Sequence, residues 1–203
     1  SDFIRAYIAE KRKIPADDLI SELIAAEESG AKLSTDELIT TCILLLNAGH
    51  EATVHTIGNG VKTLLETGIR PGASVDALAE EIMRFDPPLH MFTRYAYEDV
   101  TLFDHQFKRG DQVACLLAAS GRDPTPYPDP ASFDPYRKRL PHHAFGAGIH
   151  FCVGAPLARL ELDIAFRTLF ARAPDIALAE KPRYANVYHF HGLERLLVSN
   201  AKG

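Results

Sequence analysis

Apolar residues recur at every third or fourth position through the first part of the chain, which is the spacing of one helix face. Residues 15–30 show this pattern and predict a short amphipathic helix. Residues 34–68 continue it without a proline and open on Ser34 and Glu37, the two members of a capping box. This segment predicts one long helix. A third helix is predicted over residues 74–85, ahead of two consecutive prolines.

The periodicity changes beyond these prolines. Residues 93–120 alternate short apolar groups with turn residues, and they predict a small antiparallel sheet. Residues 121–143 are rich in proline and aspartate, so an irregular segment is expected there. The aromatic residues within it favour a loop that is packed in place over a disordered linker. These aromatic residues are Tyr127, Phe133 and Tyr136.

The last part of the chain predicts one more helix and a hairpin. Residues 156–172 place Leu157, Leu160 and Ile164 on one stripe, with a proline in the first turn. Residues 186–200 are typical of two short strands that pair with each other. The predicted fold class is therefore mainly α with small antiparallel β-sheets.

Composition narrows the class of protein. The 203 residues are 46% hydrophobic and 24% charged, which is enough for one large domain or two small ones. A net charge of −5 argues against nucleic acid and against an anionic membrane surface as partners. The longest apolar runs fall short of the ~20 residues that a membrane span requires. The chain is expected to be soluble and cytoplasmic.

The three cysteines do not indicate a shared structural role. Cys42, Cys115 and Cys152 form no C-x-x-C pair, and their odd number argues against a disulfide framework. Cys42 and Cys115 lie in apolar helix and strand contexts, so both are predicted to be small core residues. Cys152 needs a separate explanation.

The stretch "NAGHEATVH", residues 47–55, places polar residues inside an apolar helical segment. His50 and His55 lie about 140° apart around a helix, so they are not spaced to share a metal ion. The leucines at 44–46 favour burial of the segment. Gly49 weakens the helical ladder, and a local distortion is predicted there.

Cys152 lies in a glycine-rich turn just ahead of the helix predicted from residue 156. Free backbone N–H groups at a helix N-terminus stabilise a thiolate, the form of cysteine that binds metals or attacks carbon. The residues leave three interpretations open: an iron ligand, a nucleophile with His150 as its base, or a buried structural cysteine.

The segment "FGAGIHFCVG", residues 145–154, resembles the cysteine-ligand loop of the cytochrome P-450 family, the haem-thiolate monooxygenases. The resemblance implies that Cys152 is the iron ligand and that the cofactor is haem b, iron protoporphyrin IX. It also implies that the chain, residues 1–203, is the C-terminal half of such a domain. The implied cofactor contacts in this loop are Phe145, Gly146, Gly148, His150 and Gly154, together with Cys152 itself.

Other segments resemble the same family in the same order along the chain. Glu81 and Arg84 match its Glu-x-x-Arg pair, and Arg137 stands where the family has the third member of a buried ionic cluster. Without the resemblance, an exposed helix pair would be the better interpretation of Glu81 and Arg84. Arg94 and His150 resemble the residues that pair with the haem propionates.

Residues 48–53 resemble the oxygen-binding groove of the family's long central helix. The resemblance implies haem contacts from Ala48 and Gly49 and a proton-handling role for Glu51. The family's threonine position is Ala52 here, and the next residue, Thr53, points about 100° away around an ideal helix. The catalytic residues implied are therefore Glu51, Thr53 and Cys152.

The resemblance further implies insertion of one atom of O2 into a small, largely apolar organic molecule. Electrons would come from a donor of the ferredoxin or flavodoxin type. Because the family's N-terminal half has no counterpart in these residues, exposed apolar surface and self-association are expected. The candidate substrate-contacting residues, by analogous position, are Leu89, Met91, Phe92, His189 and Phe190.

Two other classes of function stay open from the sequence. The native protein could be a haem-thiolate protein that uses peroxide or does no oxygenation, because such a protein keeps Cys152 and tolerates Ala52. Alternatively, the chain as given could be an inert, haem-free fragment that associates with itself.

Overall fold

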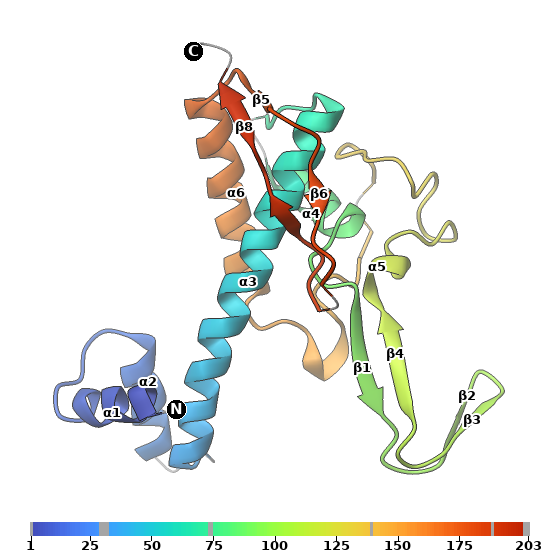
Figure 1. Ribbon diagram of the computed structural model, residues 1–203. Coiled ribbons are helices and arrows are strands. Elements are labelled where there is room, and N and C mark those ends of the chain that lie inside the picture. Colours follow the sequence, from blue (N-terminus) through green and yellow to red (C-terminus); the bar gives the residue numbers. More distant parts are fainter. Residues whose placement is uncertain (1, 29–32, 73–74, 139, 188, 201–203) are drawn as a thin grey trace. The chain divides into compact units, whose positions relative to one another are not determined.

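A computed structural model describes residues 2–28, 33–72, 75–138, 140–187 and 189–200 (Figure 1). The chain divides into two compact units, Ser1–Glu51 and Ala52–Gly203. Each unit has its own hydrophobic core, and each is described by itself below.

The first unit is helical. It contains α1 (Asp2–Lys11), α2 (Leu19–Glu28) and the beginning of α3 (Thr35–Thr67). The predicted helix over residues 15–30 is confirmed as α2, and residues 29 and 30 lie outside the described residues. The core of this unit consists of Ile8, Ile24, Leu38, Ile39 and Cys42. The predicted burial of Cys42 is therefore confirmed.

Helix α3 begins with the predicted capping box. The backbone N–H of Ser34 donates to Glu37 Oε2 at 2.7 Å, and the backbone N–H of Glu37 donates to Ser34 Oγ at 3.3 Å. The helix then runs to Thr67 as one α-helix. The distortion predicted at Gly49 is wrong, since no break in the helix occurs there. The predicted burial of residues 44–46 is also wrong for Leu44 and Leu46, whose side chains are exposed.

The core of the second unit lies among the end of α3, α4 (Asp76–Phe85) and α6 (Ala155–Arg172). The ring of Phe166 is fully buried at the centre of this core and lies against Gly60 of α3. A Cβ atom at position 60 would come within 2.4 Å of Phe166 Cζ. This glycine therefore allows the close approach of α3 and α6. The predicted third helix is confirmed as α4, and residue 74 lies outside the described residues.

Helix α6 confirms the helix predicted over residues 156–172, with a proline in its first turn. Its buried face carries Leu162, Phe166 and Phe170. The stripe of Leu157, Leu160 and Ile164 is exposed instead, each side chain by more than half. The apolar spacing alone does not say which of two apolar faces packs on the core.

The predicted small sheet forms as two antiparallel pairs. Strand β1 (Met91–Tyr95) pairs with β4 (Gln112–Leu116), and β2 (Val100–Leu102) pairs with β3 (His105–Phe107). Cys115 lies on β4 and is exposed, so its predicted burial is wrong. A two-stranded ribbon leaves alternate side chains without a covering layer, which explains this exposure.

The proline-rich segment of residues 121–143 is irregular, as predicted, and it follows the short helix α5 (Leu117–Ser120). Tyr127 is buried and Phe133 packs against the main core, which confirms a packed loop. Tyr136 is 88% exposed, so its predicted packing is wrong.

The end of the chain pairs differently from the prediction. Strand β7 (Leu193–Arg195) pairs with β6 (Arg183–Tyr184), and β8 (Val198–Asn200) pairs with β5 (Ile176–Leu178). The predicted hairpin within residues 186–200 is therefore wrong. Among the described residues, no helix is both long and apolar enough to cross a membrane.

Candidate functional site

The loop that carries Cys152 is closed by its own backbone. The N–H of Cys152 donates to the carbonyl of Phe145 at 2.9 Å, and the N–H of Ala155 donates to the carbonyl of Cys152 at 3.2 Å. Gly146 and Gly148 have φ angles of +71° and +66°, which side chains other than glycine rarely adopt. The loop contains one short 3-10 turn, η1 (Gly148–His150), and leads directly into α6. The thiol therefore lies just before the N-terminus of α6.

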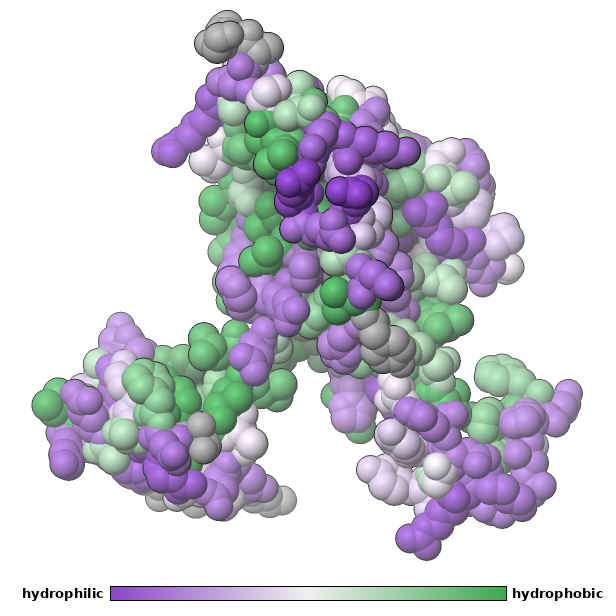
Figure 2. Space-filling model, in the orientation of Figure 1, coloured by the Kyte–Doolittle hydropathy of each residue, from purple (hydrophilic) through white to green (hydrophobic). Residues whose placement is uncertain are grey.

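The surroundings of the Cys152 thiol are apolar and open. Cys152 itself is exposed. Ile149, Phe151 and Val153, which flank it in the sequence, are exposed by 97%, 48% and 87%. Figure 2 shows hydrophobic side chains reaching the surface on the displayed face of the molecule. Soluble proteins rarely leave large apolar side chains of this kind uncovered around a reactive group, so a ligand or partner surface is indicated.

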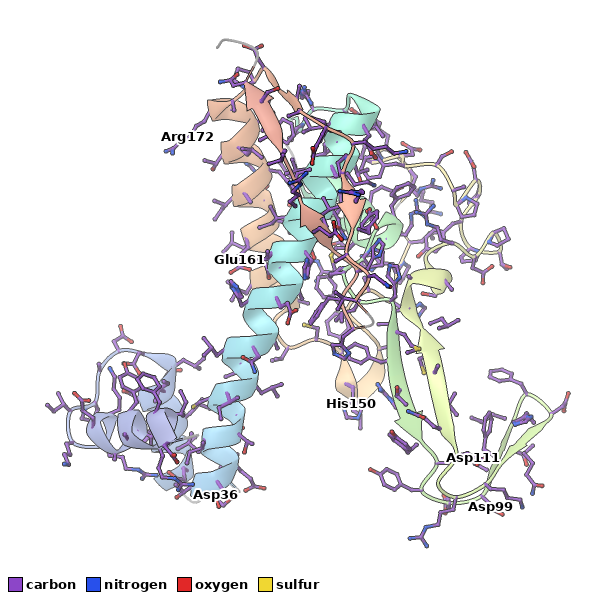
Figure 3. All side chains as sticks on the ribbon, viewed as in Figure 1. Asp36, Asp99, Asp111, His150, Glu161 and Arg172 are labelled. Atoms are coloured by element: carbon purple, nitrogen blue, oxygen red, sulfur yellow. The ribbon has the colours of Figure 1, made fainter. Side chains whose placement is uncertain are left out.

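The donor set fits a haem. A soft thiolate is a known haem-iron ligand, and the exposed apolar side chains beside it suit the faces of a flat macrocycle. Gly154 has no side chain beside the sulfur. A Cβ atom at this position would lie 3.8 Å from Sγ, in van der Waals contact with it. His150 lies at the outer edge of the same loop and is exposed (Figure 3).

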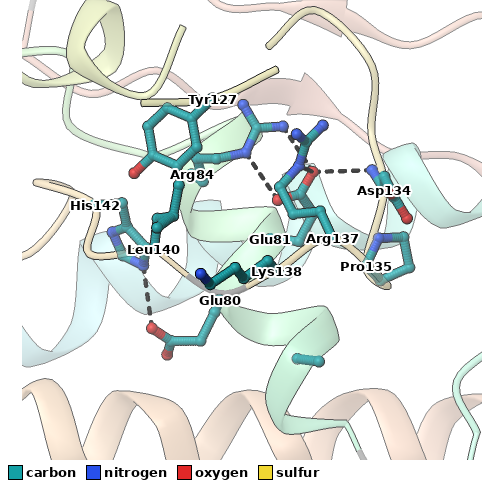
Figure 4. Close-up of a pocket in the computed structure, with 11 residues that line it drawn as sticks. Glu80, Glu81, Arg84, Tyr127, Asp134, Pro135, Arg137, Lys138, Leu140 and His142 are labelled. Carbon is teal, nitrogen blue, oxygen red and sulfur yellow. Dashed lines mark hydrogen bonds and ion pairs between the residues drawn. The ribbon is translucent and has the colours of Figure 1, made fainter. Parts of the chain in front are cut away.

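A buried ionic cluster joins α4 to the proline-rich loop. Arg84 donates to Glu81 through two parallel hydrogen bonds, Nε to Oε2 at 2.8 Å and Nη2 to Oε1 at 2.6 Å. Arg137 Nε lies 3.2 Å from the same Oε1 (Figure 4). The side chains of Glu81 and Arg84 are 4% and 2% exposed, so the exposed helix pair is excluded. The structure thus brings together the three residues that the resemblance singled out.

The same cluster organises the proline-rich loop. Arg84 Nη1 donates to the carbonyls of Gly121 and Pro130 at 2.7 and 2.9 Å, and Nη2 donates to the carbonyl of Ser132 at 3.0 Å. Together with the two bonds to Glu81, these contacts use all five N–H groups of the guanidinium. A cavity of only about 40 Å³ adjoins the cluster, which is too small for an organic substrate. We assign the cluster a structural role.

A second ionic cluster ties α4 to the cysteine loop. Arg159 of α6 donates to Glu80 from Nε at 2.6 Å and from Nη2 at 3.1 Å. Its guanidinium also lies 4.7 Å from the centre of the Phe145 ring. His142 Nε2 lies 3.2 Å from Glu80 Oε2, although without the alignment of a hydrogen bond. Burial of Glu80 opposes its ionisation, but the contacts with His142 and Arg159 outweigh it and lower its pKa to about 2.

Replacing Glu80 with glutamine is expected to weaken the pH dependence of the free energy of unfolding in acid. A carboxyl whose pKa falls from its ordinary 4.5 to about 2 on folding stabilises the protein fully above pH 4.5. That contribution is lost as the pH falls towards 2. Urea unfolding at several pH values from about 5 to 2 should therefore show a shallower decline for Glu80→Gln than for the wild type. Parallel profiles in the two proteins would contradict this assignment.

The residues of the implied oxygen-binding segment lie on α3. Ala48, Gly49 and Glu51 are exposed at the end of the first unit. Thr53 belongs to the second unit, and its Oγ1 donates to Glu161 Oε2 of α6 at 3.2 Å. The Thr53 hydroxyl is therefore engaged with α6, and its role in proton transfer stays a prediction. Figure 3 shows Glu161 on α6.

The other predicted contact residues lie on β1, on the turn before it and on the loop between β6 and β7. Arg94 is exposed on β1, and its Nη1 donates to the carbonyl of Thr93 at 2.9 Å. Leu89 and Met91 are partly buried, and Phe92 is 37% exposed. His189 is exposed and lies edge-on to Phe190, which is partly buried and contacts the ring of His55.

Sequence reasoning missed His142 and Arg159 as supports of the cysteine loop. Arg159 follows the loop within "PLARLE", but its spacing from Glu80 gives no local signal of their contact. It also missed a cluster of Asp86, His90 and His191, whose ligand atoms all lie within 4.8 Å of one another.

Comparison with known proteins places this chain in a family. The family model Cytochrome P-450 matches residues 74–172. The polyketide biosynthesis cytochrome P-450 PksS of Bacillus subtilis (strain 168) is 41% identical over 99% of this chain and 52% of its own length. Cytochrome P-450 monooxygenase PikC of Streptomyces venezuelae is 40% identical over 90% of this chain and 46% of its own length.

Solved structures agree. A myxobacterial cytochrome P-450 in complex with myristic acid superimposes with a TM-score of 0.93 and 39% identity, covering 100% of this chain and 53% of that structure. A P-450 bound to an acyl carrier protein that carries hexadec-9Z-enoic acid gives a TM-score of 0.91 and 37% identity, covering 98% of this chain and 53% of that structure. The chain belongs to the cytochrome P-450 family, and it spans about half the length of the curated relatives it matches.

Proposed function

We propose that these residues form the cysteine-bearing half of a haem-dependent monooxygenase that inserts one atom of O2 into a small, largely apolar substrate. The observation that carries this proposal is the exposed Cys152 thiol, held at the mouth of α6 in a closed glycine loop and flanked by exposed apolar side chains. The names of the relatives PksS and PikC support an oxidative role.

In this proposal each group has a distinct task. The Cys152 thiolate would hold the haem iron and would donate electron density to it. When bound, the haem supplies the iron centre at which O2 is activated. Arg94 and His150 offer positive or hydrogen-bonding groups to its propionates. Glu51, on the exposed end of the first unit, carries protons from solvent.

A side chain of α6 holds the cysteine loop in position. Arg159 contacts both Glu80 and the Phe145 ring, so it fixes the loop against α4. Ala52, at the family's threonine position, leaves Glu51 to act through water or through a substrate hydroxyl. The substrate-contacting residues Leu89, Met91, Phe92, His189 and Phe190 stay a prediction, as does a ferredoxin or flavodoxin donor. A cytoplasmic location also stays a prediction.

The visible spectrum of the reduced protein with carbon monoxide tests the proposal. After reconstitution with haemin, the wild-type chain should show the far-shifted Soret band of haem-thiolate proteins. Cys152→Ser should abolish this band, because a hydroxyl does not replace the thiolate. Cys115→Ser is the matched control, since Cys115 is equally exposed but lies on β4, and it should keep the band.

A wild-type chain without the band, or a band that survives in Cys152→Ser, would overturn the proposal for this polypeptide. The exposed side chains of Leu44, Leu46, Leu157, Leu160 and Ile164 favour a second candidate. In that case the 203 residues form a haem-free fragment that self-associates through apolar surface. Sedimentation of the haem-free chain, read together with its haem uptake on reconstitution, distinguishes the two candidates. Self-association without haem uptake fits only the second.

A further inference from the structure

Three side chains that commonly bind metals converge at the end of α4. Asp86 caps the C-terminus of α4, His90 lies in the turn before β1, and His191 lies in the loop between β6 and β7. One ligand atom from each lies within 4.8 Å of the others. None of the three has a task in the proposed monooxygenase.

The carboxylate of Asp86 is held in a fixed position. Its side chain is 10% exposed, and it accepts a hydrogen bond on Oδ2 from the hydroxyl of Tyr184. Oδ1 faces His191, with 3.0 Å between Oδ1 and Nε2. The carboxylate is thus held by Tyr184 and aimed at His191.

The backbone of His191 is equally constrained. Its N–H donates to the carbonyl of Pro88 at 2.7 Å, and its carbonyl accepts from Asn59 Nδ2 at 2.9 Å. Its ring stacks against Tyr184 at 3.9 Å and against His90 at 4.0 Å between centroids. Two of the three ligands are therefore already in place, while the third, His90, is exposed and stacks on His191, so its ring must turn to bind the ion.

This ligand set is suited to zinc. Two imidazoles and one carboxylate, with a fourth position open to water, form a common catalytic zinc arrangement. Ligand atoms about 2.1 Å from a tetrahedral ion lie roughly 3.4 Å apart. The Asp86 to His191 distance already approaches this value, and rotation of the His90 ring closes the remaining separation. Zinc would take the place of the hydrogen between Oδ1 and Nε2, with the imidazole proton on Nδ1.

Lys62 forms an ion pair with this carboxylate, and Arg122 also interacts with it electrostatically. The Nζ of Lys62 lies 3.6 Å from Asp86 Oδ2, the oxygen that faces away from His191. The same Nζ lies closer to Glu66 Oε2, at 3.2 Å. Its charge therefore has a second acceptor, and Oδ1 is left to the metal.

We propose that Asp86, His90 and His191 bind one zinc ion. A bound ion would join the end of α4, the turn before β1 and the β6–β7 loop. Those segments also carry Leu89 and Phe190, and Met91 begins the adjoining strand β1, so zinc would stiffen the predicted substrate-contacting region. The site does not include Cys152, and the proposal is independent of haem binding.

Titration with zinc chloride, followed by calorimetry and thermal unfolding, tests the site. The wild-type chain should bind one equivalent of zinc, and His90→Ala should bind it with an affinity at least about tenfold lower. Saturating zinc should raise the unfolding midpoint of the wild type by roughly 5 °C and that of the variant much less. His90→Gln, which keeps a polar side chain there, should behave like His90→Ala.

His189→Ala is the matched control, because this exposed histidine lies on the same loop as His191 but outside the cluster. It should retain the zinc equivalent, and so should Cys152→Ser. Zinc bound by thiols elsewhere would persist in all the histidine variants. Equal zinc binding by the wild type, His90→Ala and His90→Gln would overturn the proposal, as would an equal loss in His189→Ala.

Discussion

Replacing Arg84 with methionine is expected to lower the free energy of unfolding by about 3–5 kcal/mol. Among the described residues, the substitution leaves Arg137 as the charged partner of the buried Glu81 carboxylate. It also removes three hydrogen bonds to backbone carbonyls of the proline-rich loop, of which those of Pro130 and Ser132 keep contacts with Arg122 and Arg137. A buried charge without its partner and unsatisfied carbonyls are both costly in an interior of low dielectric constant.

Urea unfolding followed by circular dichroism measures this loss. Arg195→Met is the matched control, because Arg195 also makes two hydrogen bonds to one carboxylate, that of Glu180. Those side chains are 60% and 42% exposed, so this control should change stability by about 0–1 kcal/mol. Arg84→Lys should also destabilise, since an ammonium group lacks the planar fork that reaches Glu81 and the carbonyls together. Similar losses for Arg84→Met and Arg195→Met would contradict the assigned role.

Phe166→Ala should be the most damaging substitution in the apolar core, at about 3–5 kcal/mol. The ring is fully buried between α6 and α3, and Gly60 offers no side chain that could fill the space left behind. The loss therefore includes both the transfer of the ring to water and an uncollapsed cavity.

Leu160→Ala provides the comparison on the same helix. Leu160 is 54% exposed, so its truncation should change the free energy of unfolding of the haem-free chain by no more than about 0.5 kcal/mol. The two variants share a helix and a loss of apolar atoms but differ in burial. Comparable unfolding midpoints for the two proteins would show that Phe166 is not at the centre of the core.

The sequence was sufficient to predict the long helix and the ligand loop. Ser34 and Glu37 are a local signal, and the structure shows their reciprocal hydrogen bonds. The glycines around Cys152 likewise predicted a tight turn before a helix, and positive φ angles occur at two of them. In both cases the interactions that set the conformation lie within a few residues of one another.

Pairings between distant segments could not be predicted in the same way. Strands β5, β7 and β8 have three residues each, too few to show alternation or to choose a partner. The predicted terminal hairpin was wrong for this reason. The cluster of Asp86 and His191 was missed because a histidine in a loop gives no sign of the carboxylate it will meet. Tyr136 shows the converse, since an aromatic residue in a loop need not pack.

The attachment of the proline-rich loop to Arg84 has a consequence for the order of folding. The described residues of the loop form no helix or strand, and three of their carbonyls accept hydrogen bonds from a side chain of α4. The loop can therefore gain its native shape only after that helix exists and the arginine is turned inward, in a step that closes a long stretch of chain. We expect the helices to assemble early and this loop to settle late.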